Sequence, residues 1–137
     1  MMMGTTLGAR RKLQFVLFIM VLHSAVTGLL LITLPGEWFA WFGLNVHPQR
    51  FFSCQGGIFH IILAVAYGMG MIHPVKYALM IHFSIFVKFC AALFLFAFFL
   101  FCDTVLFILL NALLDGFLGG LLLFTYGGFR RTLYNEP

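Results

Sequence analysis

Two charged residues inside apolar stretches are the first candidates for chemistry in this sequence. Lys88 lies within residues 77–101 and Asp115 within residues 105–126, each near the middle of a run long enough to cross a bilayer. A charge at the centre of a membrane helix costs about 2.5–3.5 kcal/mol on insertion scales, so such side chains face the bundle interior and pair with one another. We therefore expect Lys88 and Asp115 to form an ion pair or a neutral hydrogen-bonded pair.

Two histidines accompany this pair at a similar depth. His23 lies near the middle of residues 13–34, and His60 lies near the middle of residues 51–73. One ionisable residue at a common depth on each of four spans predicts a polar cluster inside the bundle. Asn111, one helical turn before Asp115, is expected to hydrogen-bond near its carboxylate.

This cluster is compatible with several kinds of chemistry. The Lys88–Asp115 pair could fix the register of two helices, relay protons or cations, or anchor the polar head of an amphiphilic ligand. His23 and His60 could be satisfied within the bundle or ligate a haem, because neutral imidazole is a common axial ligand. His82 is expected to be independent of the cluster, and His47 and His73 are expected at the membrane interface.

A second polar group is expected at one membrane face. Glu37, Arg50 and Asp103 fall at the same level, which predicts a salt bridge involving Arg50, or a lipid phosphate bound by it. Cys54 and Cys102 lie near the same face and could form a disulfide or serve only as packing residues. The three cysteines have no spacing typical of a metal site, so no metal is expected.

Four apolar segments must position these residues. They span residues 13–34, 51–73, 77–101 and 105–126. The first is too long for the apolar core of a signal peptide, so we interpret it as a retained helix. Pro35 and Gly36 end it, Pro74 ends the second, and Gly127-Gly128 is expected to break the last. Residues 36–43 contain both tryptophans, which is typical of a short interfacial helix.

Composition supports the same class. Hydrophobic residues make up 63% of the 137 residues. Charged residues make up 9%, which is well below the charged share of soluble proteins. We predict an all-α integral membrane four-helix bundle that forms one domain over residues 1–137. The short connections predict that the second, third and fourth spans are antiparallel neighbours.

The distribution of positive charge predicts the orientation. Six Lys and Arg residues lie on the side of the termini, whereas Arg50 alone lies on the other side. Both termini are therefore expected in the cytoplasm. The net charge of +4 comes mostly from residues that flank apolar segments, so no basic surface for nucleic acid is expected.

The layout resembles the DoxX-like group of small four-helix bacterial membrane proteins. The features that carry this resemblance are Leu34-Pro35 followed by an aromatic segment to Gly43-Leu44, then Arg50 before Gly56-Gly57, Tyr67 and Pro74, a lysine in the third span and Asp115 in the fourth. The resemblance implies a four-helix bundle of a bacterial inner membrane that is often an accessory partner of a redox or other membrane complex. It brings no catalytic residues to this chain.

Three function classes follow. The sequence has no nucleophile elbow, HExxH or phosphate-binding loop, which favours a non-enzymatic accessory subunit that holds a lipid or other apolar ligand between its helices. The first alternative is a small proton-coupled transporter or channel, and the second is a haem- or quinone-binding redox subunit. The expected partners are the lipid bilayer and either other membrane subunits or a second copy, with Gly116, Gly119 and Gly120 as a packing face.

Overall fold

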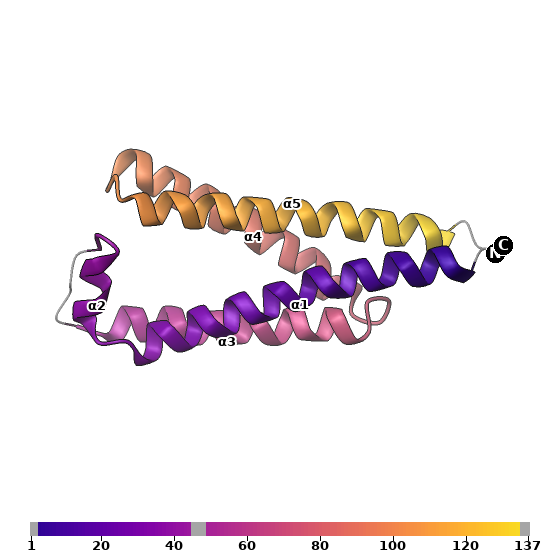
Figure 1. Cartoon of the computed structure of the whole chain (residues 1–137), viewed down its shortest axis with the longest axis horizontal. Helices are drawn as coiled ribbons and strands as arrows, with labels where there is room; N and C mark the ends of the chain where they lie inside the picture. The colour runs from indigo at the N-terminus through magenta and orange to yellow at the C-terminus, as the bar shows by residue number, and fades with distance from the viewer. Residues whose placement is uncertain (1–2, 45–48, 135–137) are drawn as a thin grey trace.

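The computed structural model describes residues 3–44 and 49–134, and helices account for nearly all of this part. The five helices are α1 (Met3–Thr33), α2 (Gly36–Trp41), α3 (Phe51–Ile72), α4 (Ala78–Phe101) and α5 (Leu106–Tyr134) (Figure 1). Four of them, α1, α3, α4 and α5, are long and apolar enough to cross a membrane. The prediction of an all-α membrane bundle with a short helix after the first span is confirmed.

The ends of α3 and α4 agree with the predicted spans to within one residue. α1 ends at Thr33, in keeping with the preference of helices to end before a proline, here Pro35. α2 begins directly after Pro35. Gly43 follows α2 with a φ of +75°, a conformation that side chains with a Cβ rarely adopt. The return from α4 into α5 takes only residues 102–105, so the middles of these two helices lie opposite one another.

Two predicted helix ends are wrong. α1 begins at Met3 rather than at residue 13, and α5 continues through Gly127 and Gly128 to Tyr134. Glycine inside a helix costs about 1 kcal/mol relative to alanine, but packing offsets this cost. Leu13 and Phe129 are 0% and 2% exposed within one cluster, against which Ala9 also packs. The extra turns of α1 and α5 are therefore held by contact with each other.

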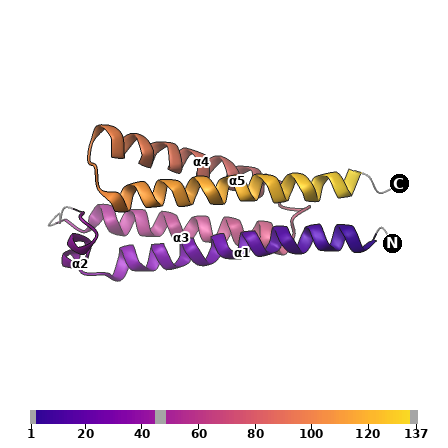
Figure 2. The ribbon, with the colours of Figure 1, turned by 45° about the horizontal axis from the view of Figure 1, so that its top comes forward.

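The four long helices form two close pairs. α1 packs most extensively on α3, and α4 packs on α5 (Figures 1 and 2). α1 and α5 also contact each other, whereas α3 and α4 contact each other less than any of these three pairs, although a short turn joins them. The expected antiparallel order of these helices is present, but the strongest pairing joins α3 to α1 rather than to its successor.

Glycines explain why α1 and α3 approach so closely. A Cβ built on Gly57 would lie 2.7 Å from the Gly28 carbonyl oxygen, and one built on Gly28 would lie 2.8 Å from the Gly57 carbonyl oxygen. Only residues without a side chain fit at this crossing. Gln14 adds a side-chain tie, because its Nε2 donates to the Met71 carbonyl at 2.9 Å. Small residues at a close crossing are a common device of membrane helix pairs.

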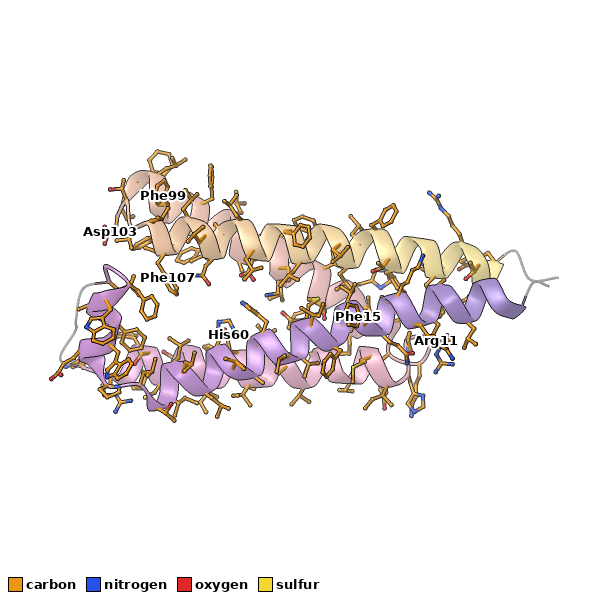
Figure 3. The ribbon with its side chains drawn as sticks, in the orientation of Figure 1. Arg11, Phe15, His60, Phe99, Asp103 and Phe107 are labelled. Atoms are coloured by element: carbon orange, nitrogen blue, oxygen red, sulfur yellow. The ribbon has the colours of Figure 1, made fainter. Side chains whose placement is uncertain are left out.

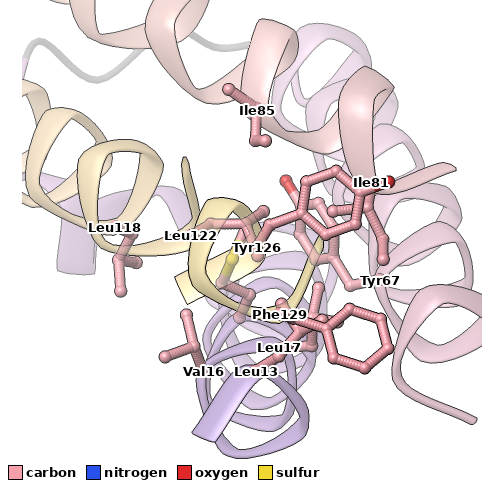
Figure 4. Packing of buried hydrophobic residues seen from close by; sticks show 11 residues of the cluster. Leu13, Val16, Leu17, Tyr67, Ile81, Ile85, Leu118, Leu122, Tyr126 and Phe129 are labelled. Carbon is pink, nitrogen blue, oxygen red and sulfur yellow. The ribbon is translucent and has the colours of Figure 1, made fainter. Parts of the chain in front are cut away.

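One end of the bundle, which we call the closed end, has a packed interior, although an open cavity of about 660 Å³ lies between the start of α1 and the end of α5. The closed end holds both ends of the chain and a cluster of buried residues from all four long helices (Figures 1 and 4). The members of this cluster are Leu13, Val16, Leu17, Met20, Tyr67, Ile81, Ile85, Leu118, Leu122, Tyr126 and Phe129. At the opposite end, which we call the open end, the two helix pairs separate and α2 lies beside the gap (Figure 1).

Candidate functional site

Lys88 and Asp115 form the predicted pair. Lys88 Nζ lies 2.5 Å from Asp115 Oδ1, and the two side chains are 3% and 11% exposed. The pair joins the middle of α4 to the first half of α5. Gly119 makes room for it, because a Cβ at that position would lie only 3.1 Å from the Lys88 Cβ. The small-residue face expected on the last span therefore packs against the helix that carries the lysine.

Tyr67 of α3 completes the surroundings of the lysine. Lys88 Nζ lies 5.9 Å from the centre of the Tyr67 ring, within the range of a cation–π contact. Tyr67 is fully buried and belongs to the closed-end cluster. A contact between Tyr67 and the lysine was not predicted from the sequence. The signal was available, because Tyr67 follows His60 by seven residues, or two helical turns.

A cavity lies on the open side of the ion pair, and we call it the midplane cavity. Its volume is about 510 Å³. Polar residues at its inner end are His23, Thr27, His60, Asn111 and Asp115, and its apolar lining is Leu30, Leu31, Leu34, Phe39, Phe42, Leu44, Leu95, Phe107 and Ile108. The His60 side chain points into the space between the two helix pairs (Figure 3). The ring of Phe42 lies 4.8 Å from that of Phe107, which bridges the segment after α2 to α5.

A smaller cavity of about 210 Å³ lies beside the lysine. It shares His60, Leu95 and Asp115 with the midplane cavity and is also lined by Lys88 and Tyr67. His60 and Asp115 therefore border both spaces. Of the four ionisable residues expected at one depth, three border the midplane cavity and Lys88 reaches it through its partner Asp115.

Several buried polar atoms around this site have no hydrogen-bond partner among residues 3–44 and 49–134. They are His23 Nδ1, His60 Nδ1, Ser24 Oγ and Tyr67 Oη. The hydroxyls of Ser24 and Tyr67 are neighbours that can bond to each other. The two ring nitrogens are then the atoms that need a partner, since an unpaired buried polar atom costs about 1–3 kcal/mol. The two imidazole rings can each donate or accept, depending on the tautomer. The site is thus able to bind a hydroxyl or carbonyl group in otherwise apolar surroundings.

The expected role of Asn111 is wrong. Its Nδ2 donates to the Phe107 carbonyl at 2.8 Å, one turn earlier in the same helix, rather than near the Asp115 carboxylate. The half-buried amide bonds to its own helix, as short polar side chains can. Asn111 still contributes to the lining of the midplane cavity.

A haem between His23 and His60 does not fit this arrangement. Bis-histidine ligation needs a flat macrocycle between the two rings, and hence between the helices that carry them. α1 and α3 instead meet with backbone contact at Gly28 and Gly57, close to both histidines. Within the described part of the chain, no three His, Cys, Asp or Glu side chains are grouped to hold a metal ion.

The predicted salt bridge at the open end is also wrong. Arg50 Nη2 donates to the carbonyl oxygens of Ile32 at 2.6 Å and Leu34 at 3.2 Å, and Arg50 forms no salt bridge with either acidic residue, Glu37 or Asp103. The last carbonyls of a helix have no intrahelical donor, and a nearby arginine can supply one. Arg50 and Asp103 nevertheless line a common cavity of about 390 Å³, which we call the outer cavity.

The remaining candidates lie away from the ion pair. Cys54, Cys90 and Cys102 are free, so the Cys54–Cys102 disulfide is not formed, and Cys90 and Cys102 are exposed rather than packed. His82 is separate from the cluster, as expected, with Nδ1 2.8 Å from the Ala78 carbonyl and its ring against Tyr126. His73 is at the end of α3, and His47 lies outside the described residues.

No protein-family model, curated protein or solved structure matches this chain. The resemblance to DoxX-like proteins therefore stays a prediction, and the site is interpreted from its own geometry.

Proposed function

We propose that this chain is a non-enzymatic membrane protein that holds an amphiphilic, lipid-soluble ligand in the midplane cavity and serves as an accessory subunit of a membrane complex. The observation that carries the proposal is the combination of apolar walls with an inner end where His23, His60 and Asp115 converge. Two of these residues offer ring nitrogens without a partner among the described residues. Apolar pockets with a few convergent polar groups are typical of small-molecule sites.

The ligand class follows from the lining of the cavity. Its long apolar wall suits a hydrocarbon or isoprenoid chain, and its inner end suits a neutral hydroxyl or carbonyl head. A charged head is disfavoured, because the nearest ions, Lys88 and Asp115, already neutralise each other. A quinone has both the polar head and the apolar tail and belongs to this class.

The accessory role and the orientation have separate support. The resemblance to DoxX-like proteins favours a partner in a bacterial inner membrane, and the many exposed aromatic side chains of α4 offer surface to lipid or to another subunit. The termini lie together at the closed end (Figure 1). The six positive charges near that end favour the cytoplasmic side for it.

The test is extraction of the intact chain from native membranes in mild detergent, followed by mass spectrometry of bound proteins and small molecules. We expect one amphiphile to co-purify with the wild type and to fall about tenfold in His60→Phe, which removes a polar partner and keeps the volume. His82→Phe is the matched control, because His82 does not line the midplane cavity. A monodisperse protein that carries neither ligand nor partner would contradict the proposal.

Proton-coupled transport is the second candidate. It is favoured by one observation, that His60 and Asp115 border both the midplane cavity and the cavity beside Lys88. Such a line of titratable groups is a feature of proton pathways in membranes. Transport would require the closed-end cluster to open, since it separates the ion pair from the terminal side.

Proton flux into proteoliposomes tests this candidate. Asp115→Asn keeps the shape of the side chain and removes its charge, so flux is expected to fall to background. His82→Phe, at a residue that lines neither of the two cavities, is the control and should leave the flux intact. Flux that persists in both Asp115→Asn and Lys88→Met would remove transport from consideration.

A further inference from the structure

The outer cavity is a second site that adjoins the midplane cavity and, unlike it, is lined by charge of both signs. Arg50 and Asp103 both line it, together with the polar side chains of Gln49 and Ser53. The two charges are not paired with each other, since Arg50 Nη2 bonds to the carbonyls at the end of α1. A cation and an anion that share a cavity without forming a salt bridge can each bind an opposite charge of one ligand.

The geometry of Arg50 favours a phosphate as one of these charges. Two backbone carbonyls hold Nη2 at 2.6 and 3.2 Å, which fixes the guanidinium plane. The described contacts use Nη2 alone, so the donors on Nη1 and Nε remain for an anion. With Nη2 engaged, Nη1 and Nε can each donate one hydrogen bond to a phosphate oxygen, and the positive charge of the guanidinium strengthens both bonds.

The carboxylate of Asp103 is the second charge that the ligand must match. It lies in the turn between α4 and α5, at the open end (Figure 3), and is half-buried. Its carboxylate forms no salt bridge with any residue of the described part of the chain. A ligand with only a phosphate would bring a second negative charge near this carboxylate. A ligand that also carries an ammonium group would satisfy both side chains and keep the site neutral.

The rest of the lining indicates that the ligand has an apolar tail. Phe52 and Phe98 border the outer cavity, and Leu31, Phe39 and Ile108 border both the outer and the midplane cavities. The tail of a ligand bound at Arg50 and Asp103 can therefore pack on side chains of α1, α3 and α5. The tryptophans of α2, Trp38 and Trp41, are 47% and 79% exposed at the same end, which is typical of the headgroup level.

We propose that the outer cavity binds a zwitterionic phospholipid with a primary ammonium headgroup, its phosphate on Arg50 and its ammonium on Asp103. The carboxylate can accept N–H hydrogen bonds from a primary ammonium but not from a trimethylammonium group, which carries no N–H. The site therefore distinguishes phosphatidylethanolamine from phosphatidylcholine by hydrogen bonding and from phosphatidylglycerol by charge. The headgroup contacts, Arg50 and Asp103, do not line the midplane cavity, so the headgroup preference can be tested independently of the midplane ligand.

Native mass spectrometry of the full chain, with equimolar phosphatidylethanolamine, phosphatidylglycerol and phosphatidylcholine, tests the proposal. We expect the wild type to retain phosphatidylethanolamine about fivefold over the other two lipids, the effect of one partly exposed charge pair. Asp103→Asn should reduce this ratio to about one, whereas Asp103→Glu, which keeps the charge, should preserve most of it. Equal retention of the three lipids by the wild type would overturn the proposal.

Two controls make the result specific to the site. Glu37→Gln removes a carboxylate at the same end that does not line the outer cavity, so the lipid preference should not change. If Glu37→Gln lost the preference as Asp103→Asn does, a general surface effect would replace the proposed site. Soluble phosphoethanolamine at millimolar concentration should not displace the lipid, because it lacks the tail. Displacement would identify a water-soluble phosphoamine as the ligand and overturn the lipid assignment.

Discussion

At the closed end, eleven side chains from all four long helices fill the space between the two helix pairs. At the open end the same pairs separate, and the space between them is the midplane cavity of about 510 Å³. Both ends have apolar walls, so hydrophobicity does not distinguish them. In a bilayer, apolar burial gives no advantage over contact with lipid tails, and the fit between side chains decides which surfaces stay together.

The ion pair lies at the boundary between the closed-end cluster and the midplane cavity. Tyr67 belongs to the closed-end cluster and also faces Lys88, whereas Asp115 borders the midplane cavity. The pair therefore has dense packing on one side and an accessible space on the other. The packed side fixes the position of the ion pair, and the cavity leaves the Asp115 carboxylate accessible from the other side.

The largest effect is expected from breaking the pair itself. Lys88→Met leaves the Asp115 carboxylate buried without its partner and should destabilise the protein by about 3–5 kcal/mol. Thermal unfolding in detergent measures the change. The double variant Lys88→Met/Asp115→Leu removes both charges and is the control. It should recover most of the loss, and a double variant as unstable as the single one would show that the charge is not the cause.

Gly57→Ala should separate the helix pair that both ends share. The new Cβ would lie 2.7 Å from the Gly28 carbonyl oxygen and 2.6 Å from Ile32 Cγ1, so α1 and α3 must move apart. Overpacking of this kind costs about 1–3 kcal/mol. Gly56→Ala, one residue earlier, meets only Leu31 Cδ1 at 3.8 Å and should not destabilise the protein, because alanine also favours the helix. Equal unfolding temperatures for the two variants would contradict the close crossing.

Truncation of one side chain at each end compares the packing of the closed end with that of the open end. Leu122→Ala at the closed end should cost about 1–2 kcal/mol, mostly through the void that it leaves, because Leu122 is fully buried. Phe42→Ala at the open end removes a larger side chain that is 45% exposed, and it should cost less than Leu122→Ala despite its size. Chemical unfolding of both variants measures the order, and a reversed order would mean that the open end is packed as tightly as the closed end.

The smallest effect tests the extension of α5 and has the opposite sign. Gly127→Ala should stabilise the protein by about 0.5–1 kcal/mol, because alanine favours a helix and its Cβ would meet nothing within 4 Å. Gly43→Ala is the contrast, since a φ of +75° strains any residue with a Cβ. A loss of stability in Gly127→Ala would indicate that the helix ends at this glycine.

Much of this arrangement could be predicted from the sequence. Long apolar runs define the spans, and a charge in each of two helices joined by a tight turn leads directly to the Lys88–Asp115 pair. Local patterns do not show how far a helix continues when its end packs on a distant segment. The extension of α5 depends on Phe129, whose neighbours in the cluster come largely from other helices.

The hydrogen-bond partners of two polar side chains could not be predicted from the sequence either. Arg50 had two acidic candidates by sequence, but it binds the carbonyls at the end of α1, whose position depends on the close pairing of α1 with α3. Asn111 prefers the carbonyl one turn back in its own helix. In both cases a backbone acceptor replaced the predicted side-chain partner. Every residue of a helix carries a backbone carbonyl, so the sequence does not show which carbonyl a side chain will bond to.

The separation of the helix pairs gives the molecule a wedge shape, narrower at the closed end than at the open end (Figure 1). A wedge takes more area in one leaflet of a bilayer than in the other. The lateral pressure within the wider leaflet therefore acts on the distance between the pairs, and curvature that relieves this pressure favours the separated form. The membrane around the protein therefore contributes to the width of the midplane cavity.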